Sequence, residues 1–149
     1  MSALLKVVID TSIWIRILLG GRLTLPVLEA WQNGLFQSVS SEPLLAELSE
    51  VWQRPRLKKH IEEQDAQDLL EQIRHRSVMV ELVTTPPRCR DPQDEPVLAT
   101  AIDGKADVIV TGDSDMRSDD ALREAMATYS VQLWGVDTLL EKVASDDDE

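Results

Sequence analysis

Short apolar runs rich in β-branched residues alternate along the chain with longer segments of helical periodicity. The first run, residues 4–9 (LLKVVI), is typical of a strand that a parallel sheet buries on both faces. Further strands are predicted at residues 35–39, 78–83, 107–111 and 131–134. Helices are predicted at residues 13–19, 25–33, 42–52, 95–105, 119–127 and 136–143, with a turn and another helix within 56–76. The alternation predicts an α/β fold with one parallel sheet and helices on both faces, joined by right-handed crossovers.

Composition limits the class of protein. A chain of 149 residues with 43% hydrophobic and 28% charged residues fits one soluble globular domain. We expect that domain to cover residues 1–143, with a disordered acidic tail at 144–149. The one cysteine, Cys89, excludes an internal disulfide and favours the reducing cytoplasm. One cysteine with His60 and His75 cannot form a structural zinc site, and no segment is apolar enough for a signal peptide or membrane span.

The chain carries a net charge of −12, with a pI of about 4.5. This charge argues against non-specific attraction of nucleic acid by the molecule as a whole. The last four residues supply four of the negative charges, which leaves −8 for the rest of the chain. Bound metal would neutralise further acids at a site. The acidity therefore weakens a nuclease interpretation without excluding it.

Four carboxylates, far apart in sequence, lie where a predicted strand ends or a predicted helix begins. They are Asp10, Glu47, Asp94 and Asp113. The carboxyl ends of parallel strands meet at one edge of a sheet, where active sites form in α/β folds. Carboxylates gathered there repel one another unless a hard cation lies between them, and Mg²⁺ and Mn²⁺ prefer oxygen ligands. The pattern favours a metal-dependent phosphodiesterase.

Each acid also has an ordinary structural interpretation. Asp10 is a good helix N-cap, and Glu47 lies on the border of an apolar helical arc that Glu50 directly opposes. Asp94 precedes a helix that it can cap, with Asp91 as the alternative candidate for the site. Taken alone, each of these three acids is explained by its structural role. The metal-site interpretation is favoured only because they are expected at the same sheet edge.

The segment that follows the strand VIVT has the same ambiguity. Gly112 allows a sharp turn, and Asp113 suits an Asx turn as well as a metal site. Asp115 is a candidate outer ligand.

The densest basic cluster follows the helix of Glu47 and comprises Arg54, Arg56, Lys58, Lys59 and His60. Arg88 and Arg90 precede Asp94 closely enough to join it. The candidates for contact with an RNA backbone are Arg54, Arg56, Lys58, Lys59 and Arg90. A solvated, charge-balanced helix end is the usual explanation of such a run. Trp14, Trp31 and Trp52 have apolar neighbours at helical spacing, so we expect them in the core or at an interface.

Three segments resemble PIN domains: VVIDTSIWI, PLLAELSEVWQRPRL and RDPQDEPVLATAIDGKADVIVTGDSDM. The resemblance covers residues 7 to about 141 and is closest to bacterial toxins of toxin–antitoxin pairs related to VapC. It implies a three-layer fold with strand order 3-2-1-4-5 and an acidic pocket for Mg²⁺ or Mn²⁺. The acids of the family fall on Asp10, Glu47, Asp94 and Asp113.

The same resemblance implies a function. It predicts an endoribonuclease whose product carries a 5′-phosphate and whose partner is a small antitoxin protein. Many relatives form homodimers, so a homodimer is also expected. Hydroxyls at the strand ends fall on Thr11 or Ser12 and on Thr111. Ser12 stands where many relatives carry Asn, and Pro96 follows the third acid closely.

Two other functions remain open at this stage. A phosphotransfer or phosphatase domain also places an Asp at the end of the first strand. The haloacid-dehalogenase pattern requires a second Asp where Ser12 stands, and a receiver domain requires a lysine that residues 111–116 lack. A non-catalytic module that binds a partner protein is the second alternative.

Overall fold

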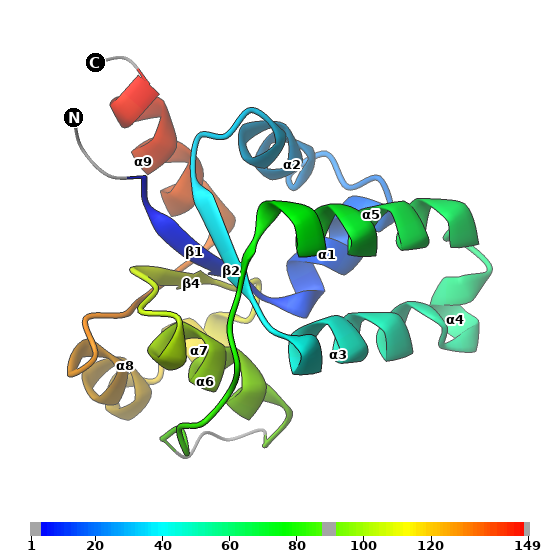
Figure 1. Ribbon diagram of the computed structural model, residues 1–149. Coiled ribbons are helices and arrows are strands. Elements are labelled where there is room, and N and C mark those ends of the chain that lie inside the picture. The colour runs from blue at the N-terminus through cyan, green and yellow to red at the C-terminus, as the bar shows by residue number, and fades with distance from the viewer. Residues whose placement is uncertain (1–3, 88–91, 148–149) are drawn as a thin grey trace.

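The computed structural model describes residues 4–87 and 92–147, with side chains through residue 144. Within these residues five parallel strands form one sheet in the order β3-β2-β1-β4-β5, which confirms the expected order. Figure 1 shows β1 beside β2 and β4 in the middle of the molecule. The strands are β1 (Lys6–Ile9), β2 (Gln37–Ser40), β3 (Val78–Met79), β4 (Val108–Val110) and β5 (Gln132–Trp134). β1, the first strand along the chain, is therefore the central strand of the sheet.

Helices connect the strands and cover both faces of the sheet. They are α1 (Thr11–Leu18), α2 (Leu25–Gln32), α3 (Glu42–Trp52), α4 (Pro55–Lys58), α5 (Glu63–Arg76), α6 (Glu95–Asp103), α7 (Ser114–Arg117), α8 (Asp120–Ala127) and α9 (Val136–Asp147). A 3₁₀ turn, η1 (Pro92–Asp94), leads directly into α6. The chain thus forms the three-layer α/β/α arrangement that the sequence predicts.

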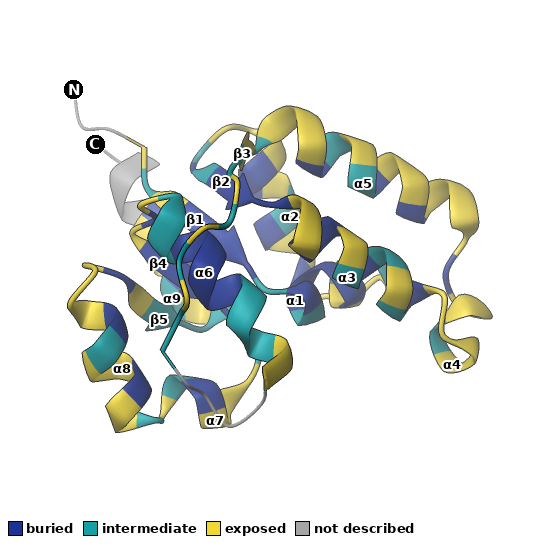
Figure 2. Ribbon diagram, turned by 60° about the horizontal axis from the view of Figure 1, so that its bottom comes forward, coloured by how far each residue is buried: buried dark blue, intermediate teal, exposed yellow. Residues whose placement is uncertain are grey.

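The pleat of the two central strands divides the core into two halves. Val7 and Ile9 of β1 face one half, which α1, α2, α3, α5 and α9 cover. Val8 faces the other half, which α6, α7 and α8 cover together with Leu44 of α3. Figure 2 shows α6 as a largely buried helix against the sheet, whereas α4 is mostly exposed. Both faces of β1 are buried, as its continuous apolar sequence predicts.

Trp14, Trp31 and Trp52 lie in the core, which was one of the two places predicted for them. Trp52 is 1% exposed and Trp31 is 2% exposed. The rings of Trp14 and Trp31 meet edge to face, with centroids 4.8 Å apart. Trp31 Nε1 donates a hydrogen bond to Ser38 Oγ on β2 at 2.9 Å, so α2 is fixed to the sheet by a polar contact as well as by packing.

The third strand is shorter than the predicted 78–83. Its pairing with β2 ends near Met79, after which the backbone N–H groups of Val83 and Thr84 both donate to the Asp103 carboxylate. The Thr84 hydroxyl also donates to Asp103. These bonds draw the chain away from the sheet edge towards the end of α6, which alternating apolar residues alone could not indicate.

Two other segments differ from the sequence prediction. Residues 114–117, between the predicted strand 107–111 and the predicted helix 119–127, form the short helix α7, which Asp113 caps. The final helix, predicted to end at 143, runs on through Asp147, so residues 144–147 are helical rather than disordered. Elongation of an existing helix adds one hydrogen bond per residue, and this offsets the acidic composition. Within the described residues, no helix has both the length and the apolar character needed to cross a bilayer.

Candidate active site

The register of the two central strands places Asp10 beside Thr111. Ile9 pairs with Val110 across β1 and β4, so the residue that follows each strand lies at the same edge of the sheet. Asp10 continues the ladder by donating its backbone N–H to the Val110 carbonyl at 2.9 Å. The buried Thr111 hydroxyl donates to Asp10 Oδ2 at 2.7 Å. The topology alone therefore brings a carboxylate and a hydroxyl 101 residues apart into contact.

Burial raises the pKa of the Asp10 carboxyl above its ordinary value of 3.8. Hydrogen bonds from Thr111, from the Thr11 backbone and from the Ser12 hydroxyl at 3.5 Å act in the opposite direction by stabilising the charged form. The charge of Asp113 raises the pKa further. Apart from the bond from the Thr11 backbone, Asp10 makes no side-chain capping bond to α1, so the N-cap interpretation accounts for only part of its contacts.

Asp113 caps the helix that follows it and also lies beside Asp10 at the sheet edge, while its role as a metal ligand stays a prediction. Its backbone N–H donates to Thr111 Oγ1 at 3.1 Å, which joins it through Thr111 to Asp10. Its Oδ1 accepts from the N–H of Asp115 at 2.9 Å and of Met116 at 3.4 Å, which caps α7. The Asp115 side chain is exposed and does not line the pocket described below.

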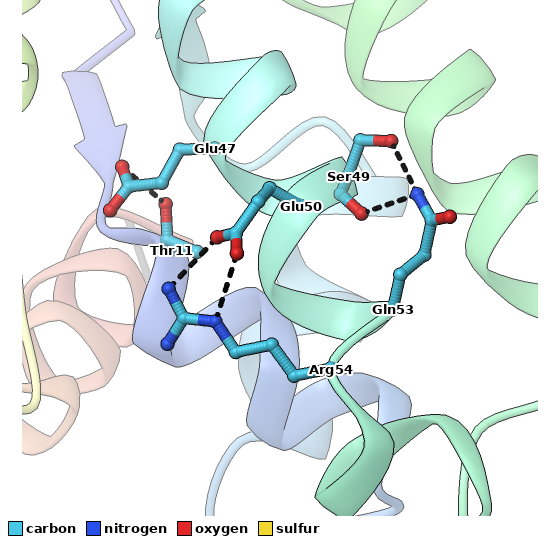
Figure 3. A network of polar contacts seen from close by, with 6 residues as sticks. All are labelled: Thr11, Glu47, Ser49, Glu50, Gln53 and Arg54. Atoms are coloured by element: carbon cyan, nitrogen blue, oxygen red, sulfur yellow. Dashed lines mark hydrogen bonds and ion pairs between the residues drawn. The ribbon is translucent and has the colours of Figure 1, made fainter.

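Glu47 enters from the helix that follows β2. The Thr11 hydroxyl donates to Glu47 Oε2 at 3.1 Å, so α1 and α3 meet at this bond (Figure 3). Glu50, three residues further along the helix, is exposed and accepts from Arg54 Nε at 3.1 Å and Nη2 at 2.8 Å. This pairing lowers the pKa of Glu50 and raises that of Arg54. The helical-arc argument thus separates an inward acid from a solvated one correctly.

Asp94 stands at the end of η1, immediately before α6. Its side chain makes no capping hydrogen bond to that helix. Pro96 occupies the first turn of α6, and it does not move Asp94 out of the pocket. The alternative acid, Asp91, and the predicted RNA contact Arg90 lie outside the described residues.

All four predicted acids line one pocket of about 470 Å³ at the carboxyl edge of the sheet. The remaining lining residues are Thr11, Ser12, Ile15, Arg16, Val51 and Gly112. Sequence reasoning missed Arg16, although it is the one cation in the apolar helix sequence IWIRIL. A cation on an otherwise apolar helix that begins at a candidate site residue is the signal that would have found it.

The donor set suits a hard divalent cation, because four carboxylates and the Thr11 and Ser12 hydroxyls offer oxygen atoms alone. In the described part of the chain, however, no three acidic, histidine or cysteine side chains form a preassembled metal-binding group. Asp10, Glu47 and Asp113 are instead held by hydrogen bonds from the protein. The chemistry of the residues therefore fits a cation, and binding one would draw the carboxylates closer together.

The basic cluster lies on and around α4. Arg56, Lys58 and Lys59 are exposed, and Arg54 reaches back along α3 to Glu50. The negative charge of Glu47 also contributes to the raised pKa of Arg54. The cluster is thus electrostatically linked to the acidic pocket through Arg54, while its contact with RNA stays a prediction.

Comparison with known proteins agrees with this geometry. The family model of the PIN domain matches residues 6–115, a span that contains all four acids of the pocket. A search of curated proteins found no match. PIN domains are generally nucleases, and they generally use divalent metal ions. The match covers well over half of the sequence, and the chain therefore belongs to the PIN-domain family.

Proposed function

We propose that this protein is a Mg²⁺- or Mn²⁺-dependent endoribonuclease. The observation that carries the proposal is the meeting of four carboxylates, from four distant segments, in one pocket at the carboxyl edge of the sheet. Burying one of them, Asp10, at a raised pKa is costly, and such costs concentrate at functional sites. A purely structural set of helix caps would not require the four acids to share a pocket.

In this proposal Asp10, Asp94 and Asp113 would hold one ion, and Glu47 would hold a second ion or orient the attacking water. A bound ion lowers the pKa of water and stabilises the leaving oxygen of the phosphodiester. The hydroxyl of Thr111 orients Asp10, and that of Thr11 orients Glu47. The protein thus fixes the direction of two carboxylates before any ligand arrives.

The direct test is cleavage of single-stranded RNA by the purified protein with Mg²⁺ or Mn²⁺. We expect cleavage to require the metal, to leave a 5′-phosphate and to be lost in Asp10→Asn. Asp120→Asn is the matched control, because it removes the same charge from an exposed position outside the pocket. Activity that survives both EDTA and Asp10→Asn would refute the proposal.

The same assay separates the alternative functions. A phosphatase would release inorganic phosphate from a small phosphomonoester and leave RNA intact. A non-catalytic partner-binding module would do neither. We therefore include a chromogenic phosphomonoester beside the RNA substrate.

The basic cluster gives a second, independent test of RNA as the substrate. Replacing Arg56, Lys58 and Lys59 by Ala should weaken RNA binding and flatten its salt dependence, because phosphate contacts set that slope. Deleting residues 146–149 should strengthen binding modestly at low salt, since exposed charges act within a Debye length of about 10 Å. Unchanged affinity and slope in the triple variant would show that the cluster is a solvated helix end.

The toxin role, the small antitoxin partner, the homodimer and the cytoplasmic location stay predictions of the sequence and its resemblance. A neighbouring reading frame that encodes a small protein would support the toxin role. Growth arrest on expression of the wild type, but not of Asp10→Asn, with rescue by that small protein, would test it directly.

A further inference from the structure

A second cavity, of about 760 Å³, lies beside the acidic pocket and shares Arg16 and Gly112 with it. It lies where β4 and β5 end, since Thr111, Gly112 and Gly135 form part of its wall. Arg16 of α1, Arg22 of the α1–α2 connection and Arg117 of α7 also line it. Among the described lining residues, Asp137 carries the negative charge that accompanies these three arginines. We call this cavity the arginine pocket; its lining is positive in a chain of net charge −12.

Two of these arginines lie against glycines at the strand ends. A Cβ atom on Gly112 would lie 2.7 Å from Arg16 Nη1, and one on Gly135 would lie 2.6 Å from Arg117 Nη1. Any larger residue would therefore displace the guanidinium groups. Both arginines are held at the edge of the sheet where ligands bind in α/β folds.

The three arginines of the arginine pocket are not held in direct ion pairs by the side chains that the structure describes. Among the side chains of residues 4–87 and 92–144, none forms a salt bridge with Arg16, Arg22 or Arg117. Arg117 Nε is buried and lacks a hydrogen-bond partner in the same part of the chain. A buried donor without an acceptor is costly, so a ligand that supplies oxygen acceptors here would bind favourably.

The start of α9 forms part of the same wall. Val136, Asp137 and Thr138, its first three residues, line the cavity. The first N–H groups of a helix have no partner within it, and the helix dipole favours an anion there. Arginine forks and helix N–H groups are together the donors that recognise phosphate.

We propose that the arginine pocket binds a phosphate group of single-stranded RNA next to the phosphodiester held at the acidic pocket. This inference rests on the proposed ribonuclease function. The shared wall of Arg16 and Gly112 makes the two pockets neighbours on one path. The volume suits a nucleotide rather than a bare phosphate, and Leu23, which is 81% exposed, offers apolar surface to a base at the rim.

Binding is tested without catalysis, on the full-length protein in EDTA. Calorimetry with inorganic phosphate, a nucleoside 5′-monophosphate, the unphosphorylated nucleoside and a short RNA separates the sources of the phosphate. We expect the nucleotide to bind more tightly than inorganic phosphate, and the nucleoside to bind much more weakly than either. Equal binding of nucleoside and nucleotide would overturn a phosphate pocket.

Arg22→Gln and Arg117→Gln should each weaken nucleotide and RNA binding about tenfold, the usual effect of losing a charge-assisted hydrogen bond. The double variant should reduce the log–log salt slope for RNA by about 0.7, the value for one phosphate on a single strand. Arg74→Gln with Arg123→Gln is the control, because both side chains are exposed and outside the cavity. Should Arg117→Gln fail to fold, Gly135→Ala displaces the same guanidinium while keeping its charge.

The remaining outcomes separate this inference from the ribonuclease proposal. With active enzyme, Arg22→Gln should raise KM for RNA and leave kcat unchanged, because it removes binding alone. Weaker nucleotide binding with unchanged RNA affinity and slope would overturn the inference, since the pocket would then serve free nucleotides. If the pocket variants lose RNA affinity while the wild type cleaves no RNA, the ribonuclease proposal fails and the phosphate pocket stands. An acidic peptide that binds the arginine pocket when no nucleotide does would overturn the inference in favour of a protein partner.

Discussion

Thr111→Val tests the hydroxyl that links the two central strands to the acidic pocket. Thr111 is fully buried; its Oγ1 donates to Asp10 Oδ2 at 2.7 Å and accepts from the Asp113 N–H at 3.1 Å. Valine has nearly the same shape without the hydroxyl, so the variant removes both bonds and keeps the packing. Any loss of stability can then be assigned to hydrogen bonding.

The expected loss follows from the two bonds. A hydrogen bond to a charged group contributes about 1.5–3 kcal/mol, whereas the Asp113 N–H belongs to an exposed residue and can bond to water instead. We therefore expect the free energy of unfolding to fall by about 2 kcal/mol at neutral pH. For a domain of this size that corresponds to a drop in Tm of about 4–8 °C.

The stability difference between wild type and Thr111→Val should depend on pH in a definite direction. The raised pKa of Asp10 means that its ionised form destabilises the folded protein; the penalty is complete above the folded pKa and absent below the ordinary value of 3.8. As the pH falls through that window the carboxyl is protonated, and the bond from Thr111 weakens to a neutral one. The difference between wild type and Thr111→Val should therefore narrow in acid. The variant should also raise the pKa of Asp10 further, because it loses a bond that lowers it.

Thermal unfolding in EDTA across this pH range measures the stability difference, and carboxyl NMR titration measures the Asp10 pKa. Thr111→Ser is the control, since it keeps the hydroxyl and loses only a methyl group. Equal melting temperatures of wild type and Thr111→Val at neutral pH, or a lower Asp10 pKa in the variant, would refute the reasoning.

Three further predictions use the same structure. Asp10→Asn should raise the Tm of the metal-free protein at neutral pH, because burial penalises the ionised carboxyl, and the gain should vanish near pH 3.8; melts at both pH values check it. Asp94→Asn and Asp113→Asn should each weaken Mn²⁺ binding at least tenfold by calorimetry, and unchanged affinity in both would remove these acids from the site. Gly104→Ala should cost about 1–3 kcal/mol in denaturant unfolding by overpacking. Its Cβ would lie 2.4 Å from Val39 Cγ1, and wild-type stability would show that β2 yields easily.

The sheet could be predicted because each strand has a local signature. The run before Asp10 is apolar on both faces, and burial of Val7, Val8 and Ile9 follows from that composition alone. Strand order came from the family resemblance, since no local pattern states which strands are neighbours. The early end of β3 could not be predicted, because it depends on Asp103, which lies 20 residues from Val83 in sequence.

The acidic pocket was predictable for a similar reason. Strand ends and helix starts converge in a parallel sheet, so the positions of Asp10 and Asp113 were enough to expect a shared edge. The helical angle of Glu47 relative to Glu50 indicated which acid points inward. The arginine pocket was not predictable, because Arg16, Arg22 and Arg117 lie in three unrelated sequence contexts and meet only through the fold. The basic cluster at residues 54–60 could be found in the sequence because its members are neighbours along the chain. Closeness along the chain does not show how near a cluster lies to the acidic pocket.

The short third strand also has a consequence for behaviour at high concentration. An exposed strand edge is a template on which a second chain can add, and the risk grows with the length of the edge. Here the β3 edge spans only Val78–Met79 before the bonds to Asp103 lift the backbone away. The adjoining segment includes Val83, which is 82% exposed and would otherwise extend an apolar edge. The bonds to Asp103 therefore limit the length of the exposed strand edge. Replacing Asp103 should lower the solubility of the protein at concentrations where RNA cleavage is still unchanged.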